Sequence, residues 1–120
     1  MKILIADDNS SVRRMIKNIL AHIAEEFYEC SDGSEVMELY SKYKPDWVLM
    51  DIKMKKMNGI KATLNLKQNF PEAKVIIITN YPTDDLREDA KKAGAIEFID
   101  KENLSCLGSI ISNFPSIQKE

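Results

Sequence analysis

The chain has 120 residues, a formal net charge of −2 and 44% hydrophobic residues, which are ordinary values for one globular domain. This weak charge gives no basic footprint for nucleic acid, and no apolar stretch is long enough to span a bilayer. Met1 leads almost directly into an apolar run, so no signal peptide is expected. Cys30 and Cys106 form no metal-ligand motif and are expected to be reduced. These features predict one cytoplasmic domain over residues 1–120, with no nucleic-acid or membrane partner of its own.

Five short apolar runs alternate with helical patterns along the chain. In order, the patterns predict a strand over 2–6, a helix over 10–23, a strand over 26–30, a helix from about 33 to the proline at 45 with Asp32 as its cap, a strand over 46–50, a helix over 59–70, a strand over 74–78, a helix over 83–93, a strand over 96–99 and a helix over 104–113. The first, third and fourth runs are almost continuously apolar, as in strands that helices cover on both faces. The alternation predicts an α/β, flavodoxin-like fold, in which a doubly wound, five-stranded parallel sheet has the order 2-1-3-4-5 and helices on both faces.

Two segments of the second half are expected to be weakly held. The helix over 83–93 has few apolar residues to bury, and it relies on acidic residues at its start, lysines at its end and the terminator Gly94. Residues 114–120 are predicted to be a flexible tail or the start of a linker.

Chemically matched polar residues follow four of the predicted strands. Asp7 and Asp8 come after the first strand, Asp51 after the third, Thr79 after the fourth and Lys101 shortly after the fifth. Because the carboxyl ends of parallel strands meet at one edge, these side chains are expected to converge where open α/β sheets bind ligands. Taken singly, such residues are more often turn formers, helix caps or solvated side chains, and only the joint pattern favours a site.

The expected cluster suits a divalent cation and a phosphoryl group. Packed carboxylates repel one another unless a cation intervenes, and Mg²⁺ (or Mn²⁺) prefers oxygen ligands and keeps positions open for others. Lys101 can neutralise phosphoryl charge, and Thr79 can donate a hydrogen bond to a phosphoryl oxygen. Asp51, at the end of a central strand, is the best candidate for a nucleophile that forms an aspartyl phosphate. Trp47, on the same strand, is expected close enough to report a bound cation.

The motifs around these residues resemble a known family. They are Ile5-Ala6-Asp7-Asp8-Asn9-Ser10, Val48-Leu49-Met50-Asp51 with Met57-Asn58-Gly59, Ile76-Ile77-Ile78-Thr79, and Ala93-Gly94-Ala95 leading to Lys101. Together they resemble a response-regulator receiver domain of two-component signalling. Glu102, directly after Lys101, makes the C-terminal part similar to receivers of the nitrate-response class of transcription factors, which carry a helix-turn-helix domain after a linker. The chain is therefore expected to be either a stand-alone receiver or one cut from a longer regulator.

The resemblance implies a phosphorelay protein that phosphorylates and dephosphorylates itself and is not a turnover enzyme. Asp51 is the implied phosphoacceptor, and the implied donor is a sensor histidine kinase or a phosphotransfer protein. Thr79 and Lys101 are the implied contacts to the phosphoryl oxygens. The implied magnesium ligands are Asp8, Asp51 and the backbone carbonyl of Lys53, with Asp7 acting largely through water.

The resemblance also implies a switch. Thr79 moves toward the phosphoryl group, and Phe98, at a position where the family often has Tyr, follows into the vacated space. The shifted surface comprises the fourth helix, the fifth strand and the fifth helix. It would control an output partner or a C-terminal output domain missing from this chain, or a phosphorylation-dependent homodimer.

Five residues near the site depart from the family pattern or modify it. Lys55 and Asn58 stand where the family commonly has Pro and Asp, so the loop after the phosphoacceptor is expected to be less rigid. Asn80 is expected to narrow access to the phosphoryl group, and Lys53 and Tyr81 flank the site and are expected to shield it from attacking water. They predict slow autodephosphorylation.

Three alternatives remain open at the level of sequence. A non-catalytic, receiver-like adaptor that binds partners without phosphorylation is disfavoured by the complete set of acids, Thr79 and Lys101. A flavin- or nucleotide-binding domain is disfavoured because Asp7 and Asp8 would repel a bare phosphate. A phosphatase with an aspartyl nucleophile is disfavoured because these two acids are adjacent and no cap domain is evident.

Overall fold

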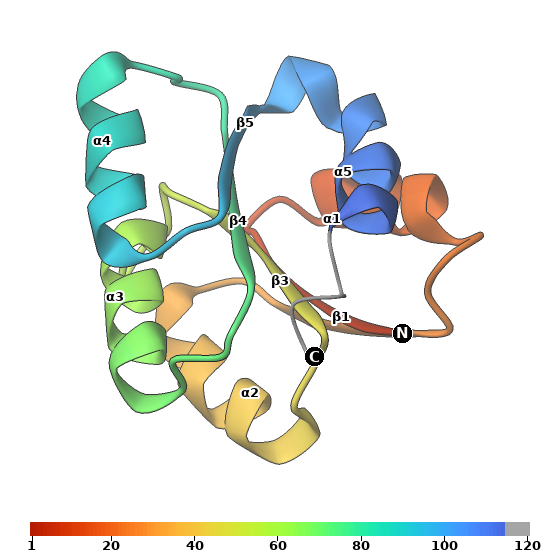
Figure 1. Ribbon diagram of the computed structural model, residues 1–120, viewed down its shortest axis with the longest axis horizontal. Helices are drawn as coiled ribbons and strands as arrows, with labels where there is room; N and C mark the ends of the chain where they lie inside the picture. Colours follow the sequence, from red (N-terminus) through yellow and green to blue (C-terminus); the bar gives the residue numbers. More distant parts are fainter. Residues whose placement is uncertain (115–120) are drawn as a thin grey trace.

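A parallel sheet of five strands in the order β2-β1-β3-β4-β5 forms the centre of the computed structural model, which describes residues 1–114 (Figure 1). The strands are β1 (Lys2–Ala6), β2 (Glu26–Cys30), β3 (Trp47–Asp51), β4 (Val75–Thr79) and β5 (Glu97–Asp100). The predicted fold class and strand order are therefore confirmed. β3 and β4 end one residue later than expected, because Asp51 still pairs with Ile78 and Thr79 still pairs with Asp100 in the sheet.

Helices cover both faces of this sheet, as predicted. The α-helices are α1 (Ser10–Leu20), α2 (Val36–Tyr43), α3 (Gly59–Asn69), α4 (Asp84–Ala93) and α5 (Leu107–Asn113), and the short 3₁₀ helices are η1 (Gly33–Glu35) and η2 (Lys101–Cys106). In Figure 1, α2, α3 and α4 lie on one side of the strands and α1 and α5 lie on the other. No helix of residues 1–114 is both long and apolar enough to cross a membrane.

The sheet separates the interior into two apolar cores. Successive side chains of a strand point to opposite faces. Accordingly, Leu4 packs with Tyr40 of α2 and Leu66 of α3, whereas Ile3 packs with Leu20 of α1 in the other core. Every residue of β3 and β4 is buried, as the continuous apolar runs predicted. The two central strands are therefore fixed from both sides, and so are the residues at their carboxyl ends.

Three helices are shorter by more than one residue than the sequence patterns indicated. α2 begins at Val36 rather than at about residue 33, because residues 33–35 form the 3₁₀ helix η1. α1 stops at Leu20 rather than Ile23, since the chain turns there toward β2 while Ile23 still packs against the core from the turn. Before α5, residues 101–106 form η2, whose backbone is kinked at Asn103. The predictions for α1 and α5 were too long because apolar residues beyond each helix continue its periodic pattern. Such a residue can be buried from a turn or a 3₁₀ helix as well as from an α-helix.

The ends of α4 follow the sequence prediction. Thr83 caps its first turn by accepting a hydrogen bond from the Leu86 N–H, and Gly94 ends it with a φ of 106°. This left-handed conformation favours glycine, which has no Cβ to clash. Ala90 and Ala93 are the buried residues of α4, so its packing rests on small side chains.

The C-terminal part and the tryptophan differ from expectation in one respect each. The predicted tail over 114–120 falls outside the described residues from 115 onward, but Phe114 is described and packs edge-on against Trp47, with ring centroids 5.2 Å apart. Trp47 begins β3 and lies four residues before Asp51, a separation of about 13 Å along a strand. It therefore lies at the opposite edge of the sheet and is not a direct reporter of the site.

Gly59, the first residue of α3, allows this helix to start against the end of β3. A Cβ at this position would lie 1.9 Å from the carbonyl oxygen of Asp51. The Gly59 N–H donates to the carbonyl of Ile52, which closes the loop between β3 and α3. Only a residue without a side chain fits such a close approach of two backbone segments.

Gly59→Ala is expected to destabilise the fold by about 3 kcal/mol, because the new methyl group must push Asp51 and α3 apart. The matched control is Gly108→Ala in α5, where a Cβ would meet nothing closer than the His22 ring at 3.6 Å. That control is expected to stabilise the protein by about 0.5–1 kcal/mol through helix propensity. Urea unfolding of the three proteins measures both changes, and equal stability of the two variants would contradict the argument.

Candidate functional site

The carboxyl edge of the sheet brings the predicted site residues together. Asp7 and Asp8 follow β1, Asp51 and Thr79 are the last residues of β3 and β4, and Lys101 directly follows β5. One carboxylate oxygen from each of Asp7, Asp8 and Asp51 lies within 4.8 Å of the other two. The structure therefore contains the convergence that strand order alone predicted.

Lys101 supplies the positive charge at this cluster. Its Nζ lies 2.8 Å from Asp7 Oδ2 and 3.3 Å from Asp51 Oδ2, and all three side chains are at least nine-tenths buried. Burial alone would lower the pKa of Lys101, but its hydrogen bond to Asp7 and the charges of both acids outweigh burial and raise it. The ammonium group therefore stays charged and bridges the two carboxylates.

The surroundings of Asp51 shift the pKa of its carboxyl group. Burial raises its pKa, and the charge of Asp7 raises it further, whereas Lys101 and a 2.8 Å hydrogen bond from the Ile52 N–H lower it. The balance is a pKa above the usual value for aspartate. A second cation at this position would lower it, because it would offset both burial and the neighbouring acid.

Asp7 is held from several sides. Its Oδ1 accepts from the Asn9 N–H at 2.9 Å, its own N–H donates to the Cys30 carbonyl at 3.1 Å, and its carbonyl accepts from the guanidinium of Arg13. Arg13 in turn contacts Glu29 at the end of β2. Asp7 is thus fixed to β2 and to the start of α1.

Asp8 differs from its neighbours. It is exposed, and within residues 1–114 its carboxylate has no hydrogen bond or ion pair. Mg²⁺ takes oxygen ligands and usually keeps several waters, so it needs only part of its ligands from the protein. The three acids, whose carboxylate oxygens lie within 4.8 Å of one another, would fit such an ion, with Asp7 contributing largely through water. The donor set, oxygen atoms with net negative charge, is the chemistry that a hard cation prefers.

Lys53, Asn80 and Tyr81, the residues predicted to modulate the site, lie in the loops that follow β3 and β4, at the entrance to the acid cluster. Thr79 is buried, and its hydroxyl accepts from the Tyr81 N–H at 3.0 Å. Tyr81 is 55% exposed, and the ammonium of Lys53 lies 4.4 Å from the centroid of its ring. Lys53 and Tyr81 therefore meet across the edge from different loops, while Asn80 is exposed between Thr79 and Tyr81.

Phe98, the predicted switch residue, lies on β5 beside α4. Its ring is partly buried, and the guanidinium of Arg87 sits 4.7 Å from the ring centroid. Arg87 also donates a long, 3.5 Å hydrogen bond to the carbonyl of Phe98. The side chain of Phe98 is thus in contact with α4 in this structure.

The sequence missed the role of Asp32 at the cluster. It was predicted as a helix cap, and it does accept from the Ser34 N–H at 2.9 Å at the start of η1. Its carboxylate also accepts from the N–H groups of Lys56 and Met57, at 2.8 and 3.2 Å, in the loop after β3. Burial would raise its pKa, but these hydrogen bonds hold the pKa at about 2, so that Asp32 is ionised at neutral pH.

Comparison with known proteins identifies this arrangement. The sequence model of one protein family, the response regulator receiver domain, matches residues 3–108 of this chain. The chain belongs to the response regulator receiver family. The family assignment predicted from the motifs is therefore confirmed, and with it a place among the receiver domains of two-component signalling.

Individual relatives support the same assignment. Chemotaxis protein CheY of Thermotoga maritima is 39% identical over 101 residues, which cover 83% of this chain and 84% of that protein. Transcriptional regulatory protein DegU of Brevibacillus brevis is 37% identical over 105 residues, which cover 85% of this chain but 44% of DegU. The chain therefore spans less than half the length of that regulator. A LuxR-family two-component response regulator from Aurantimonas sp. has the same fold, with a TM-score of 0.85 and 26% identity over 92% of this chain and 81% of that one.

Lys101→Met is expected to destabilise the metal-free protein by about 2–3 kcal/mol at pH 7, because it leaves two buried carboxylates without their counter-ion. The pKa of Asp51, already raised, would rise further. Because the folded state would then hold a proton that the unfolded state releases, the loss should grow from pH 4 to pH 8. Urea unfolding in the presence of a chelator measures it. Lys61→Met, at an exposed site on α3, is the control, and an equal loss there would refute the assigned role.

Proposed function

We propose that this receiver domain accepts a phosphoryl group on Asp51 and thereby changes the surface formed by α4, β5 and α5. The donor is the phosphohistidine of a sensor histidine kinase or of a phosphotransfer protein. The single observation that carries the proposal is the meeting of Asp7, Asp8 and Asp51 within 4.8 Å, with Lys101 in contact with two of them.

The reaction is a transfer between two nucleophiles. A carboxylate oxygen of Asp51 forms a new P–O bond while the P–N bond of the donor breaks, and the departing imidazole takes the electron pair of that bond. Asp51 Oδ1 already accepts the Ile52 N–H, and Oδ2 faces Lys101. Oδ2 is therefore the attacking oxygen we propose, because its present partner, Lys101, can shift to the phosphoryl group.

The acids also form the proposed cation site. Asp8, Asp51 and the backbone carbonyl of Lys53 would bind Mg²⁺ (or Mn²⁺), and Asp7 would contribute largely through water. A bound Mg²⁺ would neutralise the acids and stabilise the charge that develops on the transferred group. The ammonium of Lys101 already takes part of this neutralising role, through its contacts with Asp7 and Asp51.

Thr79 and Lys101 are the proposed phosphoryl contacts. The hydroxyl oxygen of Thr79 accepts the Tyr81 N–H, which leaves its own hydrogen free to be donated. Lys101 has three donors on a flexible stem and can follow the charge from a carboxylate to a phosphoryl oxygen. Both residues therefore have hydrogen-bond donors that can turn to the new phosphoryl group.

The proposed switch passes through Phe98. An aspartyl phosphate carries more charge and bulk than a carboxylate, and it would draw Thr79 toward it. Phe98, which has no hydroxyl, would then move by packing alone, and Arg87 on α4 would lose its position over the ring. An output partner, an output domain in a longer protein or a second copy of the chain would bind the altered surface.

The remaining sequence predictions belong to the same proposal. They are one receiver domain over residues 1–120, a cytoplasmic location and signalling without turnover of a substrate. The alternative is an adaptor that binds its partner without phosphorylation, and phosphorylation of Asp51 decides between the two.

Wild-type protein incubated with Mg²⁺ and acetyl phosphate is expected to gain one phosphoryl group at Asp51, detected by mass spectrometry of the intact protein and its peptides. Asp51→Asn should remain unlabelled, because an amide is not a nucleophile at neutral pH. Asp46→Asn is the matched control, since it makes the same change at the opposite edge of the sheet, where Asp46 accepts from the Lys2 N–H. Equal labelling of Asp51→Asn and wild type, or no labelling of wild type, would sink the receiver mechanism.

Lys53→Ala and Tyr81→Ala are each expected to shorten the lifetime of the aspartyl phosphate, by about threefold or more, because the pair at the entrance restricts the approach of water. Loss of phosphoryl group after removal of the donor, followed by mass spectrometry, gives the lifetime. Lys61→Ala on α3 is the control. If the lifetime is unchanged in both variants, the shielding role is wrong.

A further inference from the structure

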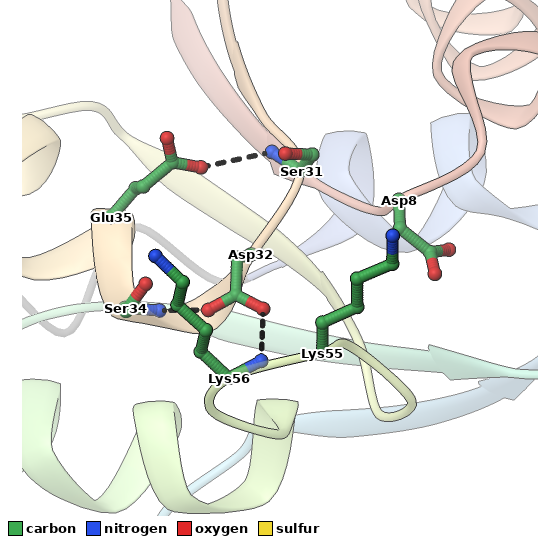
Figure 2. Close-up of a pocket in the computed structure, with 7 residues that line it drawn as sticks. All are labelled: Asp8, Ser31, Asp32, Ser34, Glu35, Lys55 and Lys56. Atoms are coloured by element: carbon green, nitrogen blue, oxygen red, sulfur yellow. Dashed lines mark hydrogen bonds between the residues drawn. The ribbon is translucent and has the colours of Figure 1, made fainter.

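Beside the acid cluster, the turn after β2 (residues 31–35) forms a corner of the protein. The turn after β2 faces the loop after β3 across a cleft of about 430 Å³ that also reaches Asp8. Figure 2 shows Asp32 in the middle of the corner, with its carboxylate between η1 on one side and the backbone of Lys56 on the other. Asp32 is 8% exposed, although its neighbours Ser31, Ser34 and Glu35 are exposed.

Asp32 is the main polar anchor of the loop that follows β3. Within the part of the chain described, the backbone of residues 53–57 makes two hydrogen bonds to other parts of the protein, and Asp32 accepts both. The sequence of the loop, Lys53-Met54-Lys55-Lys56-Met57, contains no proline and no β-branched residue that would restrict its backbone. The conformation of the loop therefore depends on this carboxylate.

Gly33 brings the corner and the loop into direct contact. A Cβ on Gly33 would lie 2.5 Å from the carbonyl oxygen of Met57 and 3.0 Å from the Cβ of Ala62. The loop thus rests on the backbone of the corner while Asp32 accepts its two N–H groups. This close fit leaves little freedom for the loop as long as both hydrogen bonds are intact.

The same corner also holds the first acid loop. The Cys30 carbonyl accepts the Asp7 N–H at 3.1 Å, and Glu29 binds Arg13, whose guanidinium donates to the Asp7 carbonyl. Residues 29–33 therefore contact both the loop that carries Asp7 and Asp8 and the loop that follows β3. A displacement of this segment would change the distance between the loop of Asp7 and Asp8 and the loop of Lys53.

We propose that Asp32 is a positioning residue for cation binding, because it holds the loop that contains Lys53, whose backbone carbonyl is a proposed ligand and which lines a common hollow with Asp8. The inference rests on the proposed cation site and extends it to a residue that does not touch the ion. Groups that orient metal ligands commonly change metal affinity by about 10- to 100-fold when they are removed.

The test measures Mg²⁺ affinity by isothermal titration calorimetry in wild type and in Asp32→Asn, which keeps the size of the side chain but places an NH₂ group against a backbone N–H. We expect affinity to fall about tenfold. Glu35→Gln, in the same cleft, removes a nearby charge but leaves the loop untouched, since Glu35 accepts from the Ser31 N–H. Asp46→Asn removes a carboxylate–backbone bond at the far edge. Both controls should stay within about twofold of wild type.

Two further readouts separate positioning from general support of the fold. Labelling by acetyl phosphate at rising Mg²⁺ should show a half-saturating concentration shifted by the same factor in Asp32→Asn, while the rate at saturating Mg²⁺ stays within about twofold of wild type. In wild type alone, added Mg²⁺ should slow hydrogen exchange of the Lys56 and Met57 amides, because coupling between tether and ion is reciprocal. This last measurement needs no variant and remains decisive even if Asp32→Asn folds poorly.

Several outcomes would overturn the inference. These are unchanged Mg²⁺ affinity in Asp32→Asn, an equal loss in Glu35→Gln, a rate that excess Mg²⁺ does not restore, or amide exchange at Lys56 and Met57 that ignores Mg²⁺. A wild type that binds no Mg²⁺ would instead overturn the proposed function, and the inference with it.

Discussion

The central constraint on this structure is the contact of two buried carboxylates, Asp7 and Asp51, with the single ammonium of Lys101. Asp7 and Asp51 are 2% and 6% exposed, so that each has lost most of its water, and such groups are costly unless a charge faces them. Lys101 supplies that charge from the end of β5, whereas the acids come from β1 and β3. The charge balance of the central strands therefore depends on a residue about 50 positions or more away in sequence. In the proposed function, an entering cation would compete with Lys101 for these acids, and a phosphoryl group would give Lys101 a new partner.

The acids are held with unequal firmness, which matters for what they can bind. Asp51 ends the fully buried strand β3, Asp7 directly follows β1, and each carboxylate accepts a backbone hydrogen bond. Asp8 is exposed and unpaired among the described residues, and Lys53 lies in a loop tethered through Asp32. A site with one fixed half and one adjustable half can close around an ion of preferred geometry without moving the sheet. If the proposed cation binds, its affinity would be set by the loops, so that residues outside the coordination sphere would influence it.

The sequence predicted most of the fold because its apolar runs record burial on both faces, and strand order then placed Asp7, Asp8, Asp51, Thr79 and Lys101 at one edge. It failed where a local pattern has two solutions. Ile23 continued the stripe of α1 but is buried from a turn, and Leu104 suggested an early start of α5 although η2 intervenes. Trp47 and Asp51 lie on the same strand but at its opposite ends, so a shared strand does not place the tryptophan near the site. Asp32 was predicted correctly as a cap, yet its bonds to Lys56 and Met57 arise from the approach of segments 24 and 25 residues apart, which no local pattern encodes.

Phe98 explains why α4 belongs to the responsive surface in the proposed switch. Its ring lies under the guanidinium of Arg87, and its carbonyl is within 3.5 Å of the same group, so one residue of α4 contacts both parts of Phe98. In the proposed switch, movement of the ring toward Thr79 would give up this cation–π contact, which is worth about 0.5–1 kcal/mol at an exposed position. The buried residues of α4 are the small side chains Ala90 and Ala93, and Leu86 packs against the same core, so Arg87 links Phe98 directly to this helix. In the proposed switch, the position of α4 would therefore follow the packing of Phe98, because this ring has no hydroxyl that could hold it by a hydrogen bond.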